Sequence, residues 1–324
     1  MSPTTRSLSL AVRGAANYVR RRPLCVSFEI TYNCNARCKH CHLGGSAPED
    51  DRTTPEEFGR ISRELKPVVA QISGGEPLLR KDVEEVVRAI RRPGRAPFIV
   101  LTTNGSLLTG EKYGRLREAG VDEISLSLDY PDERHDEFRG IPGLFQKIRT
   151  LTLGLKDVRN SGITLSCVIQ RDNFRELPRL AELAREWGLR MNFSSYTLLR
   201  TRKKEYMIPA EEIGELREVL EKIREFKKRH DTVFTSDYVL RRIPEYFTNG
   251  AVEGCRAGER FFVVNPDGTI SPCGLIIRKY RSRKEMLRDF LKTNDCALCY
   301  TSIRANTEKP ARYAIADGLR SIRS

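Results

Sequence analysis

Stretches that predict β-strands alternate with stretches that predict helices six times between residues 24 and 231. The predicted strands cover 24–31, 68–73, 98–103, 123–129, 163–170 and 190–196. One predicted helix begins after Thr54 and another ends at Gly120, and the others cover 82–92, 144–159, 177–187 and 210–230. Alternating strands and helices form a parallel sheet with right-handed crossovers. We therefore expect an α/β fold of six βα units, as an incompletely closed barrel or an open sheet, with ligands at the C-terminal ends of the strands.

The alternation stops after residue 231, which divides the chain into three predicted parts. Residues 1–23 predict a basic N-terminal helix, 24–231 the α/β core, and 232–324 a small domain built around metal ligands. In the first part, apolar residues recur at helical spacing between residues 8 and 20. We expect this helix to dock on the core; peripheral contact with a membrane surface is the alternative.

The formal net charge of +14 is concentrated at the two ends of the chain. Residues 1–23 contain five arginines and no acidic residue, and residues 278–324 contain twelve basic and five acidic residues. Such ends can contact nucleic acid, a membrane surface or an anionic substrate, or they can be ordinary solvated surface. No apolar run of about 20 residues predicts a membrane span, and no secretory signal pattern is present. We expect a cytoplasmic protein and do not favour a nucleic-acid partner.

Three of the nine cysteines, Cys34, Cys38 and Cys41, follow the first predicted strand with the spacing Cys-x3-Cys-x2-Cys. Clustered cysteines in a chain without a secretory signal are typical of metal or redox sites. Three thiolates on one loop suit a [4Fe–4S] cluster whose fourth iron stays open for another ligand. A zinc site remains an alternative, but its fourth ligand would be His40 or His42, within the same tight loop.

Four further motifs follow the cysteines, each at the end of a predicted strand or shortly after it. They are SGGEP at 73–77, LTTNG at 101–105, SLSLD at 125–129 and HDEFRG at 135–140. In this order, the motifs resemble the radical S-adenosylmethionine (radical SAM) superfamily over residues 24 to 200. The resemblance implies a partial (β/α)6 TIM-like barrel, a three-cysteine [4Fe–4S] cluster and SAM. It also implies that SAM is cleaved reductively to a 5′-deoxyadenosyl radical, which abstracts hydrogen from an unactivated C–H bond.

The resemblance also implies contacts with the methionyl end of SAM. Gly74, Gly75 and Glu76 would hold the methionyl ammonium, because glycines allow close backbone approach and a carboxylate pairs with positive charge. Arg139 would pair with the methionyl carboxylate, although a structural turn contact is the alternative for this side chain.

At the nucleoside end, the resemblance implies that Ser127 hydrogen-bonds the ribose, with Asp129 nearby. Thr103 and Asn104 would line the same rim, and the backbone of His40, just before the third cysteine, would meet the adenine. Ordinary strand-end capping is the alternative for Ser127, Thr103 and Asn104. The sequence assigns no catalytic side chain.

A second set of cysteines lies in the C-terminal part: Cys255, Cys273, Cys296 and Cys299. The Cys-x12-Gly-x4-Cys opening, with Gly268 predicted in a hairpin turn, resembles the SPASM and twitch extensions of radical SAM enzymes. Four cysteines suffice for one auxiliary [4Fe–4S] cluster, as in the shorter twitch form, and electron transfer is its implied role. A zinc ribbon is the alternative. The remaining Cys25 and Cys167 are predicted to be buried small side chains.

These observations favour a radical SAM enzyme that oxidises a peptide or small metabolite, or forms a bond in it, with a reductant such as flavodoxin or ferredoxin. A lipid-modifying radical enzyme at a membrane and a non-enzymatic metal-binding nucleic-acid module are the alternatives. Residues 196–206 are expected at the mouth of the barrel. The basic side chains there, Arg200, Arg202, Lys203 and Lys204, could bind phosphate or carboxylate, or form a solvated charged surface.

Overall fold

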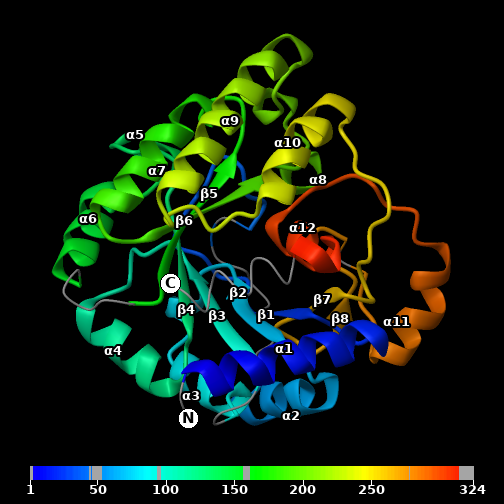
Figure 1. Ribbon diagram of the computed structural model, residues 1–324. Helices are drawn as coiled ribbons and strands as arrows, with labels where there is room; N and C mark the ends of the chain where they lie inside the picture. Colours follow the sequence, from blue (N-terminus) through cyan, green and yellow to red (C-terminus); the bar gives the residue numbers. More distant parts are fainter. Residues whose placement is uncertain are drawn as a thin grey trace.

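The computed structural model describes residues 3–43, 45, 53–92, 96–155, 161–276 and 278–313, with side chains described from residue 8 onward. Its centre is one sheet in the order β6-β5-β4-β3-β2-β1-β7-β8 (Figure 1). Neighbouring strands from β6 through β1 to β7 run parallel, and β8 is antiparallel to β7. The strands are β1 (Cys25–Thr31), β2 (Val69–Gly74), β3 (Phe98–Thr103), β4 (Glu123–Ser127), β5 (Ile163–Ile169), β6 (Arg190–Ser195), β7 (Phe261–Val264) and β8 (Ile270–Ser271).

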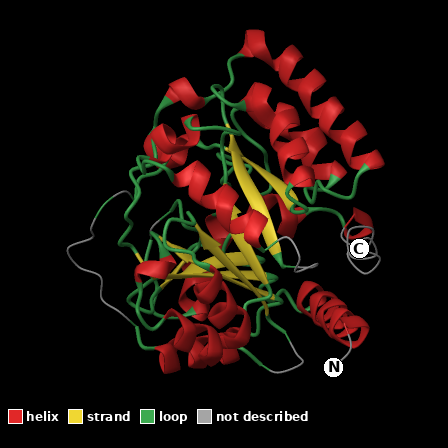
Figure 2. Cartoon of the chain, turned by 90° about the vertical axis from the view of Figure 1, so that its left-hand side faces the viewer, coloured by secondary structure: helices red, strands yellow, loops and turns green. Residues whose placement is uncertain are grey.

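Helices surround the sheet (Figure 2). They are α1 (Pro3–Val19), α2 (Pro55–Leu65), α3 (Val83–Ile90), α4 (Gly110–Ala119), α5 (Arg134–Arg139), α6 (Leu144–Gly154), α7 (Leu177–Glu186), α8 (Leu198–Thr201), α9 (Ile213–Arg229), α10 (Asp237–Asn249), α11 (Arg283–Asp289) and α12 (Ser302–Glu308). Helices α8 and α12 are among those that contribute residues to the cavity described below. No helix in the described part of the chain is both long and apolar enough to cross a membrane.

The predicted α/β fold is confirmed, and the six predicted strands appear within about two residues of their expected ends. Local capping explains several helix boundaries. The Thr54 side chain accepts a hydrogen bond from the Glu57 backbone N–H at 3.3 Å, with Pro55 in the first helical turn. Gly120 ends α4 in the left-handed conformation, with φ of 115°. The end of the helix predicted over 144–159 lies outside the described residues.

The C-terminal part continues the same sheet. Strand β7 pairs with β1 in parallel, with Cys25 opposite Phe261 and Phe28 opposite Val264. All four residues of β7 are buried, as expected for a short apolar strand covered on both faces. The predicted division at residue 231 therefore separates segments of sequence whose strands share one hydrogen-bonded sheet.

The strands place different side chains on their two faces. Phe28, Ile72, Leu101 and Leu126 belong to the hydrophobic core shared with the surrounding helices. Alternate positions on the same strands line a cavity with polar side chains: Ser27, Glu29, Gln71, Ser73, Thr102, Ser125 and Ser127. Because successive side chains of a strand point to opposite faces, this alternation directs the polar set inward. The interiors of closed TIM barrels are instead filled with bulky apolar side chains.

Candidate active site

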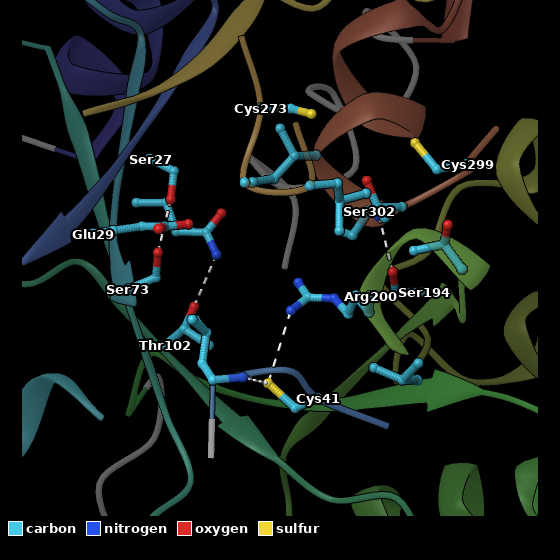
Figure 3. A pocket seen from close by; sticks show the side chains of 18 of the residues that line it. Ser27, Glu29, Cys41, Ser73, Thr102, Ser194, Arg200, Cys273, Cys299 and Ser302 are labelled. Atoms are coloured by element: carbon cyan, nitrogen blue, oxygen red, sulfur yellow. Dashed lines mark hydrogen bonds between the residues drawn. The ribbon is translucent and has the colours of Figure 1, made fainter. Parts of the chain in front are cut away.

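One cavity of about 320 Å³ extends across the C-terminal ends of the parallel strands. Both sets of cysteines line it: Cys34, Cys38 and Cys41 from the loop after β1, and Cys255, Cys273, Cys296 and Cys299 from the C-terminal part. Figure 3 shows Cys41, Cys273 and Cys299 around this space. All nine cysteines of the chain are free thiols in the structure. The fold thus brings together two thiol sets that are separated by more than 200 residues in the sequence.

Each sulfur of the first set faces a hydrogen-bond donor. The backbone N–H of Ala36 donates to Cys34 Sγ and that of Leu43 to Cys41 Sγ, each at 3.5 Å. Arg139 Nη1 lies 3.6 Å from Cys38 Sγ. Burial raises the pKa of Cys34 to about 11, so this thiol needs a strong positive partner such as iron to become a thiolate. Donors aimed at sulfur and an open cavity beside it fit an iron–sulfur cluster.

Gly74 and Gly75 line the cavity beside this loop, and their lack of a side chain is required by close backbone packing. A Cβ atom at Gly74 would lie 2.2 Å from the Thr31 carbonyl oxygen, and one at Gly75 would lie 2.1 Å from that of Asn33. The Gly75 N–H donates to the Thr31 carbonyl at 2.8 Å. The two glycines therefore let the end of β2 support the start of the cysteine loop, whatever they contact in SAM.

Glu76 lies behind the cavity wall and is 1% exposed. Its Oε1 accepts hydrogen bonds from Thr103 Oγ1 at 2.7 Å and from the Leu78 N–H at 3.1 Å, and its Oε2 accepts from the Asn104 N–H at 2.7 Å. In this structure the carboxylate therefore positions Thr103 and Asn104, which do line the cavity. Its contact with the SAM ammonium remains a prediction.

Asp129 is completely buried, and it holds Arg139. Arg139 Nε lies 2.8 Å and Nη2 2.5 Å from Asp129 Oδ2, while Asp129 Oδ1 accepts from the Val168 N–H at 3.0 Å. The guanidinium thereby spans from a buried carboxylate to Cys38 Sγ, at the edge of the cavity. Arg139 therefore makes a structural contact, which was the alternative expected for this side chain. Its pairing with the SAM carboxylate remains a prediction.

His40 and Ser127 both line the cavity. The His40 ring stacks on Phe138, with centroids 4.9 Å apart and planes 5° apart, and its Nδ1 is buried without a hydrogen-bond partner. Burial, together with the charge of Arg139, holds the pKa of His40 well below its usual value. The imidazole is therefore neutral, and its ring position is fixed by stacking.

The second thiol set is supported by a buried arginine. Cys255 and Cys296 share a hydrogen bond between their thiols, which lowers the pKa of Cys296 and raises that of Cys255. Arg304, which is 0% exposed, donates from Nη1 to the Cys299 carbonyl at 2.5 Å and pairs with Glu308 at 2.9 Å. A positive charge beside several thiols favours their ionised form, as thiolate ligands require.

The second set also shows the predicted hairpin turn. Gly268 has φ of 79° between β7 and β8, which confirms the turn glycine. Within the described ranges, no three His, Cys, Asp or Glu side chains converge as the ligands of a single metal ion do. An iron–sulfur cube does not require such convergence, because each thiolate binds a different iron.

Two further charged side chains face this cavity. The sequence assigned Glu29 no role, and it left Arg200 as either an anion-binding residue or part of a solvated surface. Glu29 lies on β1, close to the cysteine hairpin, which is formed by β7 and β8 and is followed by Cys273. A Cβ atom at Gly274 would be 2.7 Å from Glu29 Oε1. Arg200 on α8 points into the cavity, with Nη1 4.0 Å from Cys41 Sγ (Figure 3). The other three basic residues of the segment, Arg202, Lys203 and Lys204, are exposed. The alternation of Ser27 and Glu29 with buried apolar residues is the signal that could have identified Glu29.

Burial raises the pKa of Glu29 to about 7 from 4.5, although the charge of Arg200 opposes the rise. Between these values the folded protein holds a proton that the unfolded chain has lost, so stability falls as the pH increases through this window. Glu29→Gln removes the titration. From pH 6 to pH 8, its free energy of unfolding should therefore rise relative to wild type by roughly 1 kcal/mol. Urea unfolding under argon measures this, and an unchanged difference at the two pH values would contradict it.

Comparison with known proteins identifies the class of this site. Residues 28–184 match the Radical SAM superfamily. An "AdoMet-dependent heme synthase" of Methanosarcina barkeri is 30% identical over 92% of this chain and 94% of its own length. A "Probable GTP 3′,8-cyclase" of Methanocaldococcus jannaschii is 30% identical over 68% of this chain and 72% of its own. Streptococcus suis SuiB bound to S-adenosylmethionine has a similar fold, with a TM-score of 0.65 at 18% identity over 87% of this chain and 68% of its own.

A parallel α/β barrel with a three-cysteine loop at the C-terminal ends of its strands defines an iron–sulfur enzyme of the SAM-dependent type. The chain belongs to the radical SAM superfamily and is an enzyme of that superfamily. Membership implies a [4Fe–4S] cluster and SAM as cofactors, together with a reductant. The non-enzymatic alternative is therefore set aside.

Proposed function

We propose that this enzyme abstracts hydrogen from an unactivated C–H bond and completes an oxidation, or forms a bond, with the help of an auxiliary [4Fe–4S] cluster. The observation that carries the proposal is the shared cavity, because both sets of cysteines line one space. A substrate held there would be within reach of both centres. The four-cysteine set lies outside residues 24 to 200, over which the motifs resemble the radical SAM core. These four additional thiols support the assignment of a twitch-like C-terminal part.

The residues of the first loop would hold the SAM-binding cluster through Cys34, Cys38 and Cys41. When bound, the reduced cluster supplies one electron to SAM, which yields methionine and the 5′-deoxyadenosyl radical. The strand-end residues Thr103, Asn104 and Ser127 present polar groups to the same cavity, where they would orient the cofactor. Hydrogen bonds from Thr103 Oγ1 and from the Asn104 N–H to the Glu76 carboxylate would hold the first two of these residues in place before SAM binds.

In the proposed oxidation the substrate loses one hydrogen atom, and then one proton and one electron. The 5′-deoxyadenosyl radical takes one hydrogen atom from substrate carbon, which gives 5′-deoxyadenosine and a substrate radical. That radical then loses one proton and one electron to become the oxidised product. Glu29 lies in the cavity beside the cysteine hairpin and would accept the proton, since a carboxyl with a pKa near 7 exchanges protons readily at neutral pH. Cys255, Cys273, Cys296 and Cys299 would hold the auxiliary cluster, which would supply the one-electron acceptor for this step.

Arg200 indicates the class of substrate. Its guanidinium points into the cavity from α8 and could pair with a carboxylate or phosphate. The names of two kinds of relatives agree with an anionic ligand: "Fe-coproporphyrin III synthase" of Methanosarcina barkeri and the GTP cyclases. We propose an anionic small molecule, or the carboxylate of a peptide, as the substrate.

GTP and Fe-coproporphyrin III are the first probes for this substrate class. We expect one of them to stimulate 5′-deoxyadenosine formation, and Arg200→Gln to raise its half-saturating concentration about tenfold, the loss of one charge-assisted contact. The exposed Arg202→Gln is the matched control and should keep the wild-type half-saturating concentration. No stimulation by either probe, or equal behaviour of the two variants, would argue against the anionic substrate.

Anaerobic reconstitution tests the proposed function itself. The holoenzyme should contain about eight irons per chain, as two [4Fe–4S] clusters require, and should form 5′-deoxyadenosine from SAM with dithionite. Iron analysis, electron paramagnetic resonance and chromatography provide the readouts. About four irons together with 5′-deoxyadenosine would remove the auxiliary cluster, and no 5′-deoxyadenosine at all would contradict the radical mechanism.

A further inference from the structure

Helix α1 presents an apolar face to solvent. Leu8, Val12 and Val19 are 65%, 62% and 80% exposed, and Ala15 is also exposed. These four positions follow i, i+4, i+7, i+11 and therefore form one stripe along the helix. Tyr18, 47% exposed, borders the stripe. Four of the nine large hydrophobic side chains that are exposed in the described part of the chain are on this helix.

The helix docks on the protein through the side that carries Asn17. Asn17 is 2% exposed, and its Nδ2 donates to the carbonyl oxygens of Pro23 at 2.7 Å and Lys66 at 2.9 Å. Helices on soluble proteins ordinarily bury their apolar face, but the anchor at Asn17 turns that of α1 outward. Figure 2 shows this helix, beside the label N, at the edge of the molecule.

A cationic surface adjoins the C-terminal end of α1. Arg20 and Arg21 are exposed, and Arg283 Nη2 donates to the Arg21 carbonyl at 2.6 Å. This bond joins the end of α1 to residues 278–284, in which five of seven side chains are basic (Figure 1). Arg260 lies over the Tyr18 ring, 4.3 Å from its centroid. The fold thus brings the two basic ends of the sequence together beside the apolar stripe.

We propose that α1 and residues 278–284 form a docking surface for an anionic lipid bilayer. An apolar stripe flanked by arginine and lysine is the pattern of helices that lie in the plane of a membrane interface. The apolar side chains would enter the acyl boundary, while the cations contact the lipid phosphates. A second copy of this chain fits less well, because two surfaces of the same strong positive charge repel each other. The inference does not rest on the chemistry of the cavity.

Sedimentation of the holoenzyme with vesicles tests the proposal. Wild type should bind vesicles of phosphatidylcholine with phosphatidylglycerol, bind pure phosphatidylcholine vesicles far less, and be released by high salt. The triple variant Leu8→Ser, Val12→Ser, Val19→Ser should lose at least tenfold in binding. Arg20→Gln with Arg21→Gln should weaken binding to the anionic vesicles alone. Leu153→Ser, at an exposed leucine of α6, is the matched control and should bind like wild type.

Three outcomes would overturn the proposal. Wild type could stay in the supernatant with anionic vesicles, or the triple variant could bind them as well as wild type. A dimer in analytical ultracentrifugation that the triple variant dissociates, without vesicle binding, would assign the surface to a second copy. Formation of 5′-deoxyadenosine without lipid should be equal in all these variants, so failure of the docking surface is distinguishable from failure of the proposed function.

Discussion

Replacing Cys34, Cys38 and Cys41 together by alanine should abolish 5′-deoxyadenosine formation. The expectation follows from the donor arrangement at these sulfurs, where Ala36, Leu43 and Arg139 each face one thiol of the loop. Without thiolates the loop has no soft ligand for iron, and SAM has no electron donor beside it. Chromatography of the anaerobic reaction with dithionite measures the product.

The matched control is Cys25→Ala, which removes another buried thiol from β1 and leaves the loop intact. This variant should form 5′-deoxyadenosine at nearly the wild-type rate. If the triple variant still formed the product above the level of enzyme-free buffer, the assignment of the first cysteine set would be wrong. Circular dichroism of both variants separates loss of iron ligands from loss of fold.

Replacing Cys296 and Cys299 by serine should have the opposite pattern. We expect iron to fall from about eight to about four per chain, while 5′-deoxyadenosine formation persists and net turnover of substrate stops. The reason is geometric, because these thiols line the cavity from the C-terminal part, whereas Cys34, Cys38 and Cys41 lie on the loop after β1. Serine keeps the size of the side chain, and the Cys299 backbone carbonyl still accepts from Arg304.

The two cysteine variants should differ in both 5′-deoxyadenosine formation and iron content. The first should lose the radical product and retain about four irons; the second should retain the product and lose the other four. Loss of all iron in either variant would show that the two sites assemble together rather than independently. Retention of about eight irons in the second variant would remove Cys296 and Cys299 from the set of ligands.

The sequence predicted the alternating α/β core because strand and helix periodicities are local properties. The choice of a partial barrel over an open sheet came from the resemblance of the motifs. It predicted the first cysteine loop because three ligands lie within eight residues. The sequence did not show how deeply each side chain lies in the wall of the cavity. Glu76 and Asp129 belong to family motifs, yet both carboxylates accept hydrogen bonds from protein donors behind the cavity. Motif position alone does not separate a side chain that touches a ligand from one that positions its neighbour.

Long-range pairing explains the other omissions. Strand β7 is only four residues long, and nothing local indicates that it joins β1 from the far side of the chain. The positions of Glu29 and Arg200 in one cavity depend on that pairing and on the turn into α8, so the sequence alone did not predict that the two side chains share it. The anchor at Asn17 likewise depends on the carbonyl of Lys66, 49 residues away.

The pairing of β7 with β1 has a consequence for how the two thiol sets are spaced. Strand β1 leads directly into the first cysteine loop, and β7 leads into the hairpin that carries Cys273. One hydrogen-bonded ladder therefore sets the spacing between the two sets of thiols. Helices α9 and α10 lie between β6 and β7 in the sequence, and an insertion in either of them would leave this spacing unchanged. The distance that an electron would cross between the two proposed clusters therefore depends on the sheet and not on these peripheral segments.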